Sequence, residues 1–180
     1  MYNKELDKQA APSHLSKPDG LRLSPHFTLG ELCKTSVTTV GGNIPSSEDI
    51  ENLQRLCPWL EELRYTYNTL YCLKPGEDYE TSRNVEPIVI SSGYRSPDVN
   101  RCVGGACTSN HLTGCAVDIR CVGVEQAIRY AAILLDTADD WKQDFDELLI
   151  EKNRKGHFWV HFAVRPPKAG NRRRTMFLQA

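Results

Sequence analysis

The strongest structural signal in the sequence is an apolar stripe between Ser47 and Cys72. Apolar residues recur there at spacings of three and four, which is the pattern of one buried helix face. The stripe consists of Ile50, Leu53, Leu56, Leu60, Leu63, Tyr67 and Leu70. We expect the helix to begin after Pro45-Ser46-Ser47, with acidic residues 48–49 at its positive end, and to end near Cys72.

The rest of the chain predicts two further helices and a small sheet. A capping box at Thr28 and Glu31 indicates a short helix that ends near Lys34. A second amphipathic helix is expected from Val124 to about Leu135, and its buried face is predicted to hold Ile128, Ala131, Ala132 and Leu135. Short apolar runs bounded by turn residues predict strands at 85–92, 115–122, 145–151, 157–164 and, at the edge, 175–178. Helices therefore precede a small antiparallel sheet with one inserted helix, which is an α+β fold.

The 180 residues fit one domain, which we place at 23–180 after a flexible polar tail at 1–22. Apolar residues make up 40% and charged residues 25%, so the chain can bury a core and is not wholly disordered. No apolar run approaches the roughly 18 residues of a membrane helix. The first residues, MYNKELDKQAAP, lack the apolar segment of a secretory signal peptide, so we expect synthesis in the cytoplasm.

Charge is distributed unevenly along the chain. Residues 152–180 contain eight Lys or Arg and no acid, so residues 1–151 carry a net charge of −9, from 14 basic and 23 acidic residues. The isoelectric point near 6.5 argues against a dedicated nucleic-acid binder. The uncompensated basic end predicts either a site that attracts an anionic ligand or a solubilising charged edge.

Seven cysteines occur, and no pair has the CxxC spacing of zinc ribbons or thioredoxin-like sites. Without a signal peptide, we expect reduced thiols that act as small core residues. A disulfide between Cys102 and Cys107 is the alternative.

Two histidines and an aspartate form the main candidate site. His111 leads into a Gly turn, and Asp118 follows on the predicted strand 115–122, where it faces away from Cys115. A carboxylate in a strand is disfavoured and costly to bury unpaired, and a metal would remove that cost. His161, on a later strand, completes a three-ligand set with an open fourth position, which is typical of catalytic zinc sites. The spacing alone also allows a buried His–Asp pair that holds strand to turn.

Motifs spread over most of the chain resemble a known family. They are Leu23-Ser-Pro-His-Phe-Thr-Leu-Gly-Glu-Leu32, Ser91-Ser-Gly-Tyr-Arg-Ser-Pro97, Val99-Asn-Arg101, Gly104-Gly-Ala106, the block Ser109-x-His-x-x-Gly-x-Ala-x-Asp118, and Trp159-Val-His161. From about Ser24 to Ala180 the chain resembles the zinc peptidases that comprise D-Ala-D-Ala carboxypeptidases and murein endopeptidases. Within them it resembles the compact branch of bacteria and phages. Hedgehog signalling domains share that fold and zinc site, so the fold alone does not imply catalysis.

The resemblance implies one zinc ion per chain, held by the ligands His111, Asp118 and His161. It also implies that Arg95 binds substrate and stabilises the oxyanion, as a permanent cation beside a polarised carbonyl would. A salt bridge to Asp98 is the structural alternative for Arg95. Ser109 matches a serine that contacts substrate in relatives, and a hydroxyl that stabilises the turn is its alternative.

The general base is the one role for which sequence and family differ. Many relatives carry an acid a few residues before the last zinc ligand, where this chain has Phe158. We expect Glu151 to take that role, because it ends the strand that the hairpin brings back beside His161. His157 in the hairpin is the alternative, as base or as a contact to the transition state. Trp159 stands where some relatives have a histidine.

The resemblance therefore implies a zinc peptidase that hydrolyses amide bonds in peptidoglycan stem peptides, as a D,D-carboxypeptidase or an endopeptidase. We expect a monomer that binds no nucleic acid and spans no membrane. A non-catalytic, zinc-stabilised module for cell-wall binding or for a phage virion is the alternative. Since the substrate lies outside the cytoplasm, we expect a phage enzyme released at lysis or carried in the virion. A host enzyme exported by another route is the competing expectation.

Overall fold

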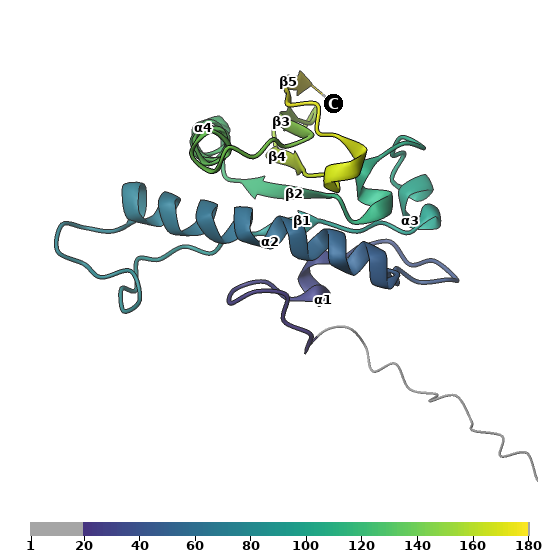
Figure 1. The fold of residues 1–180 in the computed structure, drawn as a ribbon, viewed down its shortest axis with the longest axis horizontal. Coiled ribbons are helices and arrows are strands. Elements are labelled where there is room, and N and C mark those ends of the chain that lie inside the picture. Colours follow the sequence, from purple (N-terminus) through teal and green to yellow (C-terminus); the bar gives the residue numbers. More distant parts are fainter. Residues whose placement is uncertain (1–19, 180) are drawn as a thin grey trace, which may run out of the picture.

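The predicted stripe forms the long helix α2 (Ser47–Tyr67) in the computed structural model, which describes residues 20–179 (Figure 1). The hydroxyl of Ser46 accepts a hydrogen bond from the Asp49 backbone, so the helix begins where the sequence predicts. It continues as the π-helical turn η2 (Asn68–Cys72). A π-helix has more residues per turn than an α-helix, so the apolar stripe no longer lies on one face here. Leu70, predicted to be buried, is therefore 61% exposed.

Five strands form one sheet in the order β1-β2-β4-β3-β5. They are β1 (Ile90–Ser92), β2 (Ala116–Cys121), β3 (Glu147–Lys152), β4 (Phe158–Ala163) and β5 (Arg174–Gln179). The α+β fold is confirmed, with one difference: β5 runs parallel to β3, so the sheet is mixed instead of wholly antiparallel. The end of β4 lies beside the start of β3. After β4 the chain forms the turn η4 (Pro167–Ala169) and then β5, which also begins beside the start of β3 and therefore runs in the same direction as β3. The predicted strand 85–92 pairs only over its last three residues.

The two faces of the sheet have different roles. The face with Val160 and Phe162 packs against α2 and α4 (Val124–Trp141), and the Trp59 ring of α2 lies 5.3 Å from the Phe162 ring. Figure 1 shows α2 lying along the sheet and α4 seen nearly end-on. Asp118 and His161 alternate with these apolar residues and so project from the other face. The sheet therefore separates the hydrophobic core from the candidate site.

Helix α4 is longer than predicted, and only part of its predicted face is buried. It continues six residues beyond the predicted end near Leu135. Ala131 is buried and Leu135 packs against the core as predicted, whereas Ile128 is 54% exposed and Ala132 is exposed as well. Tyr130, which was not predicted, is buried in the core. Two overlapping stripes fit this helix, and the one that buries an aromatic ring removes more apolar area from water.

The N-terminal part of the described chain packs against α2 and β1. Helix α1 (Leu29–Leu32) begins with the predicted capping box of Thr28 and Glu31. The predicted tail 1–22 lies outside the described residues except for its last three, of which Arg22 bridges to Thr28. All seven cysteines are free thiols. Among residues 20–179, no helix combines the length and the apolar character needed to cross a membrane.

The segment between β1 and β2 contains two short helices that the sequence did not predict, α3 (Pro97–Cys102) and η3 (Asn110–Thr113). Gly93 has to be glycine, because a Cβ there would lie 2.1 Å from the carbonyl oxygen of Leu32. Gly114 ends η3 with a φ of 67°, the left-handed conformation that favours glycine. These two glycines hold the segment close to α1 and α2.

Candidate metal centre

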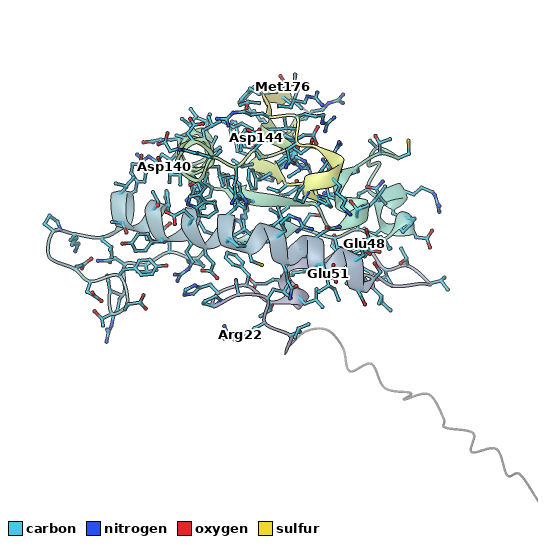
Figure 2. The ribbon with its side chains drawn as sticks, in the orientation of Figure 1. Arg22, Glu48, Glu51, Asp140, Asp144 and Met176 are labelled. Carbon is cyan, nitrogen blue, oxygen red and sulfur yellow. The ribbon has the colours of Figure 1, made fainter. Side chains whose placement is uncertain are left out.

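Sheet register places the predicted ligands of β2 and β4 next to each other. Asp118 pairs with His161 across the two strands, and His161 pairs in turn with Leu149 on β3. Met176 of β5, labelled at the outer edge of the sheet in Figure 2, ends this row. His111 reaches the same point from η3, in the segment between β1 and β2.

Three ligand atoms converge in the resulting cluster. Nε2 of His111 lies 3.2 Å from Oδ1 of Asp118 and 3.2 Å from Nδ1 of His161. The same Oδ1 lies 2.9 Å from Nδ1 of His161. All three residues are buried, with exposed fractions of 2%, 7% and 8%. In the described part of the chain, they are the one group of histidine, cysteine or acidic side chains arranged to hold a metal.

The hydrogen-bond partners of the rings determine which nitrogens face the cluster. Nδ1 of His111 lies 2.6 Å from the carbonyl oxygen of Gly93, so this nitrogen carries the hydrogen and donates it. Nε2 of His111 therefore presents a lone pair to the cluster. On His161, Nε2 lies 3.4 Å from Oε2 of Glu147, and Nδ1 faces the cluster.

The cluster needs a hydrogen or a metal ion between its lone pairs. Two nitrogens and a carboxylate oxygen at 2.9–3.2 Å repel one another through their lone pairs unless one of them carries a hydrogen or a cation lies between them. Burial disfavours charge on His161, but hydrogen bonds with Asp118 and Glu147 raise its pKa to about 9, so without a metal a proton takes that position. Burial would raise the pKa of Asp118 too, but His111 and His161 hold it well below its usual value.

A metal fits this donor set. Zinc takes histidine nitrogens and carboxylate oxygens at about 2.0–2.2 Å, so two ligand atoms of a tetrahedral site lie roughly 3.3–3.6 Å apart. The observed separations of 2.9–3.2 Å are a few tenths of an ångström shorter. Two neutral imidazoles and one carboxylate are a donor set typical of catalytic zinc sites, and they leave a bound divalent ion with a net positive charge.

Arg95 lies beside the cluster and binds one of its members. Its Nη2 donates to Oδ2 of Asp118 at 2.5 Å, and its Nε donates to Oγ of Ser92 at 2.8 Å. Asp98, the alternative partner considered from the sequence, pairs instead with Arg101 at 2.9 Å. The guanidinium thus fixes the carboxylate whose other oxygen faces the two histidines.

A pocket of about 640 Å³ opens over the cluster, and Glu151 and Arg95 line it together with the three clustered side chains. Glu151 is the cross-strand neighbour of Trp159. Burial raises the pKa of Glu151, although the charge of His161 and a hydrogen bond from Trp159 act in the opposite direction. The structure thus places a half-buried carboxylate in the same pocket as the candidate ligands.

The other two predicted site residues lie differently. His157 is exposed in the hairpin after β3 and lines a separate pocket, and its backbone N–H donates to Oδ1 of Asn153 at 3.0 Å. Ser109 lines the pocket of the cluster, and its hydroxyl accepts a hydrogen bond from the His111 backbone at 3.3 Å. Ser109 therefore caps the turn that carries a candidate ligand, and its contact with substrate stays a prediction.

Sequence reasoning missed Asn110, Asp146 and Glu147, which form a polar network next to the cluster. Asn110 donates to Asp146 at 2.8 Å and to Glu147 at 3.1 Å. Asp146 is fully buried, and the contact with His161 lowers the pKa of Glu147 to about 2. Strand alternation is the signal that could have found Glu147, because it shares a face of β3 with Glu151.

The basic C-terminal end is compensated in part, because four of its eight basic residues form ion pairs with carboxylates, and for these four the sequence prediction of uncompensated charge is wrong. Arg172 forms a two-pronged ion pair with Asp146, at 2.8 and 2.7 Å, and also lies 2.9 Å from Glu147. Other arginines of this end pair with carboxylates as well, namely Arg165, Arg173 and Arg174. Their partners come from the acidic segment 139–147, which precedes β3 and begins it, so the fold pairs these four arginines with carboxylates that the linear sequence separates from them.

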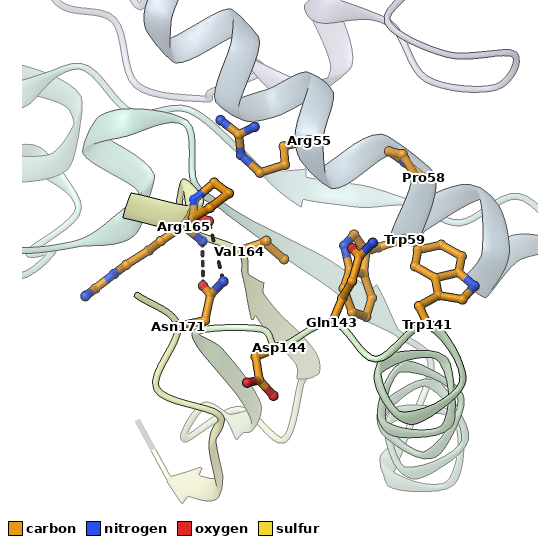
Figure 3. Close-up of a pocket in the computed structure, with 10 residues that line it drawn as sticks. Arg55, Pro58, Trp59, Trp141, Gln143, Asp144, Val164, Arg165 and Asn171 are labelled. Atoms are coloured by element: carbon orange, nitrogen blue, oxygen red, sulfur yellow. Dashed lines mark hydrogen bonds between the residues drawn. The ribbon is translucent and has the colours of Figure 1, made fainter. Parts of the chain in front are cut away.

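A second pocket, of about 500 Å³, lies between α2 and the connection from β4 to β5 (Figure 3). The rings of Trp59 and Trp141, which are 5.1 Å apart, form part of its wall. Figure 3 also shows the Asn171 side chain hydrogen-bonded to the backbone of Arg165, which fixes this connection. The pocket contains none of the clustered residues.

Comparison with known proteins identifies the central part of the chain. Residues 77–150 match the family model described as Peptidase M15. Over these residues the chain is similar to the M15 peptidases. The resemblance to the zinc peptidase family is thereby confirmed, and its compact branch of bacteria and phages stays a prediction. The M15 match includes Arg95, His111 and Asp118 and ends just before Glu151. It supports a metallopeptidase, in agreement with the cluster. No curated protein matches the chain.

Proposed function

We propose that the chain is a zinc peptidase that hydrolyses an amide bond in peptidoglycan stem peptides. The observation that carries the proposal is the convergence of three ligand atoms, from His111, Asp118 and His161, in a pocket that Glu151 also lines. The M15 match supports zinc as the metal and the cell wall as the source of substrate.

When bound, zinc supplies a Lewis acid that polarises the scissile carbonyl and acidifies a water molecule. Glu151 accepts a proton from the attacking water and delivers it to the leaving amine, while the water oxygen bonds to the carbonyl carbon and the C–N bond breaks. Burial suits Glu151 to this role, because it raises the pKa toward the range in which a carboxylate both takes up and releases protons.

Arg95 combines two roles in this proposal. Two of its N–H groups hold Asp118 and Ser92. A guanidinium has five donors, so others remain for the carbonyl oxygen of the substrate, on which negative charge develops. The hydrogen bond to Asp118 fixes the arginine beside the ligand set, which limits the reorganisation needed during the reaction.

The charge of the pocket favours a substrate with carboxylates. Four arginines line it, the carboxylates of Asp118, Glu147 and Glu151 line it as well, and Asp146 is buried behind them. The charges of the protein are thus balanced, and a bound zinc ion leaves the pocket positive. Stem peptides carry free D-carboxylates and D-Glu side chains, which match that positive potential.

A zinc-stabilised module that binds the wall without cutting it is the competing function. The position of Glu151 favours the peptidase, because a binding module needs no half-buried carboxylate beside the metal. Incubation of purified sacculi with the zinc-loaded chain separates the two functions. We expect new amines, which His111→Ala should not release because it loses a ligand.

Mass spectrometry of the digested muropeptides then identifies the bond. Loss of one terminal residue indicates a carboxypeptidase, and separation of cross-linked stems indicates an endopeptidase. Zinc-loaded protein that sediments with sacculi and releases no amine would refute the peptidase and support the binding module.

A further inference from the structure

Glu147 contacts a candidate metal ligand from the side opposite the cluster. Its side chain is 14% exposed, and it projects from β3 toward His161 on β4. Oε2 of Glu147 lies 3.4 Å from Nε2 of His161, whereas the cluster contains the other ring nitrogen, Nδ1. The carboxylate and a metal therefore do not compete for the same atom of the ring.

Both oxygens of this carboxylate are held by donors. Oε1 accepts from Nη2 of Arg172 at 2.9 Å and from Nη1 of Arg174 at 3.1 Å. Oε2 accepts from Nδ2 of Asn110 at 3.1 Å and faces His161. Arg174 belongs to β5 and Arg172 to the connection before it, so the C-terminal segment fixes the carboxylate. An anchored acceptor at this place favours a hydrogen on Nε2 of His161.

We propose that Glu147 is a positioning residue of the metal site, which keeps the hydrogen of His161 on Nε2 and so presents Nδ1 as a ligand. The inference rests on the proposed metal function and extends it to the C-terminal segment, which lies outside the M15 match. A carboxylate behind a ligating histidine fixes the ring and increases the basicity of the ligating nitrogen. Loss of such a partner typically costs about 10–100-fold in metal affinity.

Glu147→Gln is the sharpest variant, because glutamine keeps the volume but has one acceptor oxygen. Its NH₂ group has to face either the two arginines or His161 and Asn110, and each orientation sets donor against donor. We expect the zinc affinity of the full chain, measured by competition with a chelating dye, to fall about 10–100-fold. Glu125→Gln is the matched control, because Glu125 is exposed and pairs with Arg129 on α4, and it should leave the affinity unchanged.

NMR spectra of the ring nitrogens separate positioning from general stabilisation. Long-range ¹H–¹⁵N correlations report which nitrogen of each histidine carries the hydrogen. The comparison uses the metal-free wild type and metal-free Glu147→Gln at a pH at which His161 is neutral. We expect the hydrogen of His161 to lie more on Nε2 in the wild type and more on Nδ1 in Glu147→Gln, while His111 keeps its hydrogen on Nδ1 in both, because the carbonyl of Gly93 still accepts it.

A pair of arginine variants tests the same link from the C-terminal segment. Arg174→Gln removes one of the donors to Glu147 and should weaken zinc binding, though less than Glu147→Gln does. Arg173→Gln removes contacts to Asp139, Asp144 and the Phe145 ring but none to Glu147, and it should not weaken zinc binding. If Glu147→Gln does not fold, the comparison of Arg174→Gln with Arg173→Gln tests the positioning role of Glu147.

The outcomes separate the inference from the function on which it rests. A wild-type chain that binds no zinc refutes the proposed metal site. Zinc binding that is tight in the wild type and unchanged in Glu147→Gln and Arg174→Gln refutes the positioning role alone. A His161 ring whose hydrogen stays in place in Glu147→Gln refutes it as well.

Discussion

Replacing Glu151 with glutamine removes the proposed proton acceptor while keeping the shape of the side chain. Glu151 supplies none of the three converging ligand atoms, and the contacts of His111 and His161 are with Asp118 and Glu147, so this change should leave zinc bound. Loss of a positioned acid–base group slows catalysis by about 10²–10⁴-fold. That range corresponds to about 3–5 kcal/mol of lost transition-state stabilisation.

The pH profile gives a second signature of the same role. A base acts only when it is deprotonated, so kcat/KM should fall as the pH drops through the pKa of Glu151. Burial raises this pKa and moves the acidic limb toward neutral pH, while the charge of a bound metal moves it back. In Glu151→Gln, this limb should be missing from the residual activity.

Amine release from muropeptides at saturating zinc gives kcat and kcat/KM for each variant. His157→Ala is the control, because His157 is exposed and lines a separate pocket, and it should change the rate much less. Near-normal turnover of Glu151→Gln, beside an inactive but zinc-loaded His157→Ala, would move the role to His157. Activity in both variants would refute proton transfer by either side chain.

The metal and the core give two further expectations. Removal of the metal with a chelator should abolish activity and lower the melting temperature. The melting temperature falls because zinc at about 100 times its Kd stabilises the folded state by about 2.7 kcal/mol. A melting temperature that does not respond to zinc contradicts this expectation. Trp59→Ala deletes a buried ring that packs on Trp141 and Phe162, and it should lower the free energy of unfolding of the metal-free protein by about 3–5 kcal/mol in urea denaturation. A loss below about 1 kcal/mol would show that this contact does not anchor the helices to the sheet.

The sequence predicted correctly those elements that depend on interactions between residues close together in the chain. The stripe of α2 and the capping box of α1 depend on neighbours within one or two turns, and both are present. Alternation on β2 predicted that Asp118 faces away from Cys115, and Val117 and Ile119, which alternate with Asp118, are buried in the core. On α4, by contrast, two stripes fit the helical spacing, and only the tertiary environment of Tyr130 selects one of them.

Long-range contacts account for the parts of the site that the sequence did not predict. The position of Glu147 beside His161 depends on the register between β3 and β4, which is fixed by pairing across the sheet. Four arginines of the basic end look uncompensated in the linear sequence because their acidic partners lie 19–34 residues earlier in the chain. Buried Asp146 explains why arginines occur there: a fully buried carboxylate needs paired donors, and Arg172 supplies two.

The sequence left two interpretations of the cluster, and both place a proton or a metal ion between its lone pairs. In a buried His–Asp pair, a proton on Nδ1 of His161 takes that position, and the hydrogen bonds that raise the pKa of His161 to about 9 favour this proton. In a metal site, a divalent ion takes the place of this proton on Nδ1, so the two interpretations describe competing occupants of one position. A pair that only holds a strand to a turn needs neither a pocket of about 640 Å³ above it nor a second half-buried carboxylate, Glu151, in that pocket. A hydrolytic metal site needs both, because substrate and water have to reach the ion and a base has to stand beside them.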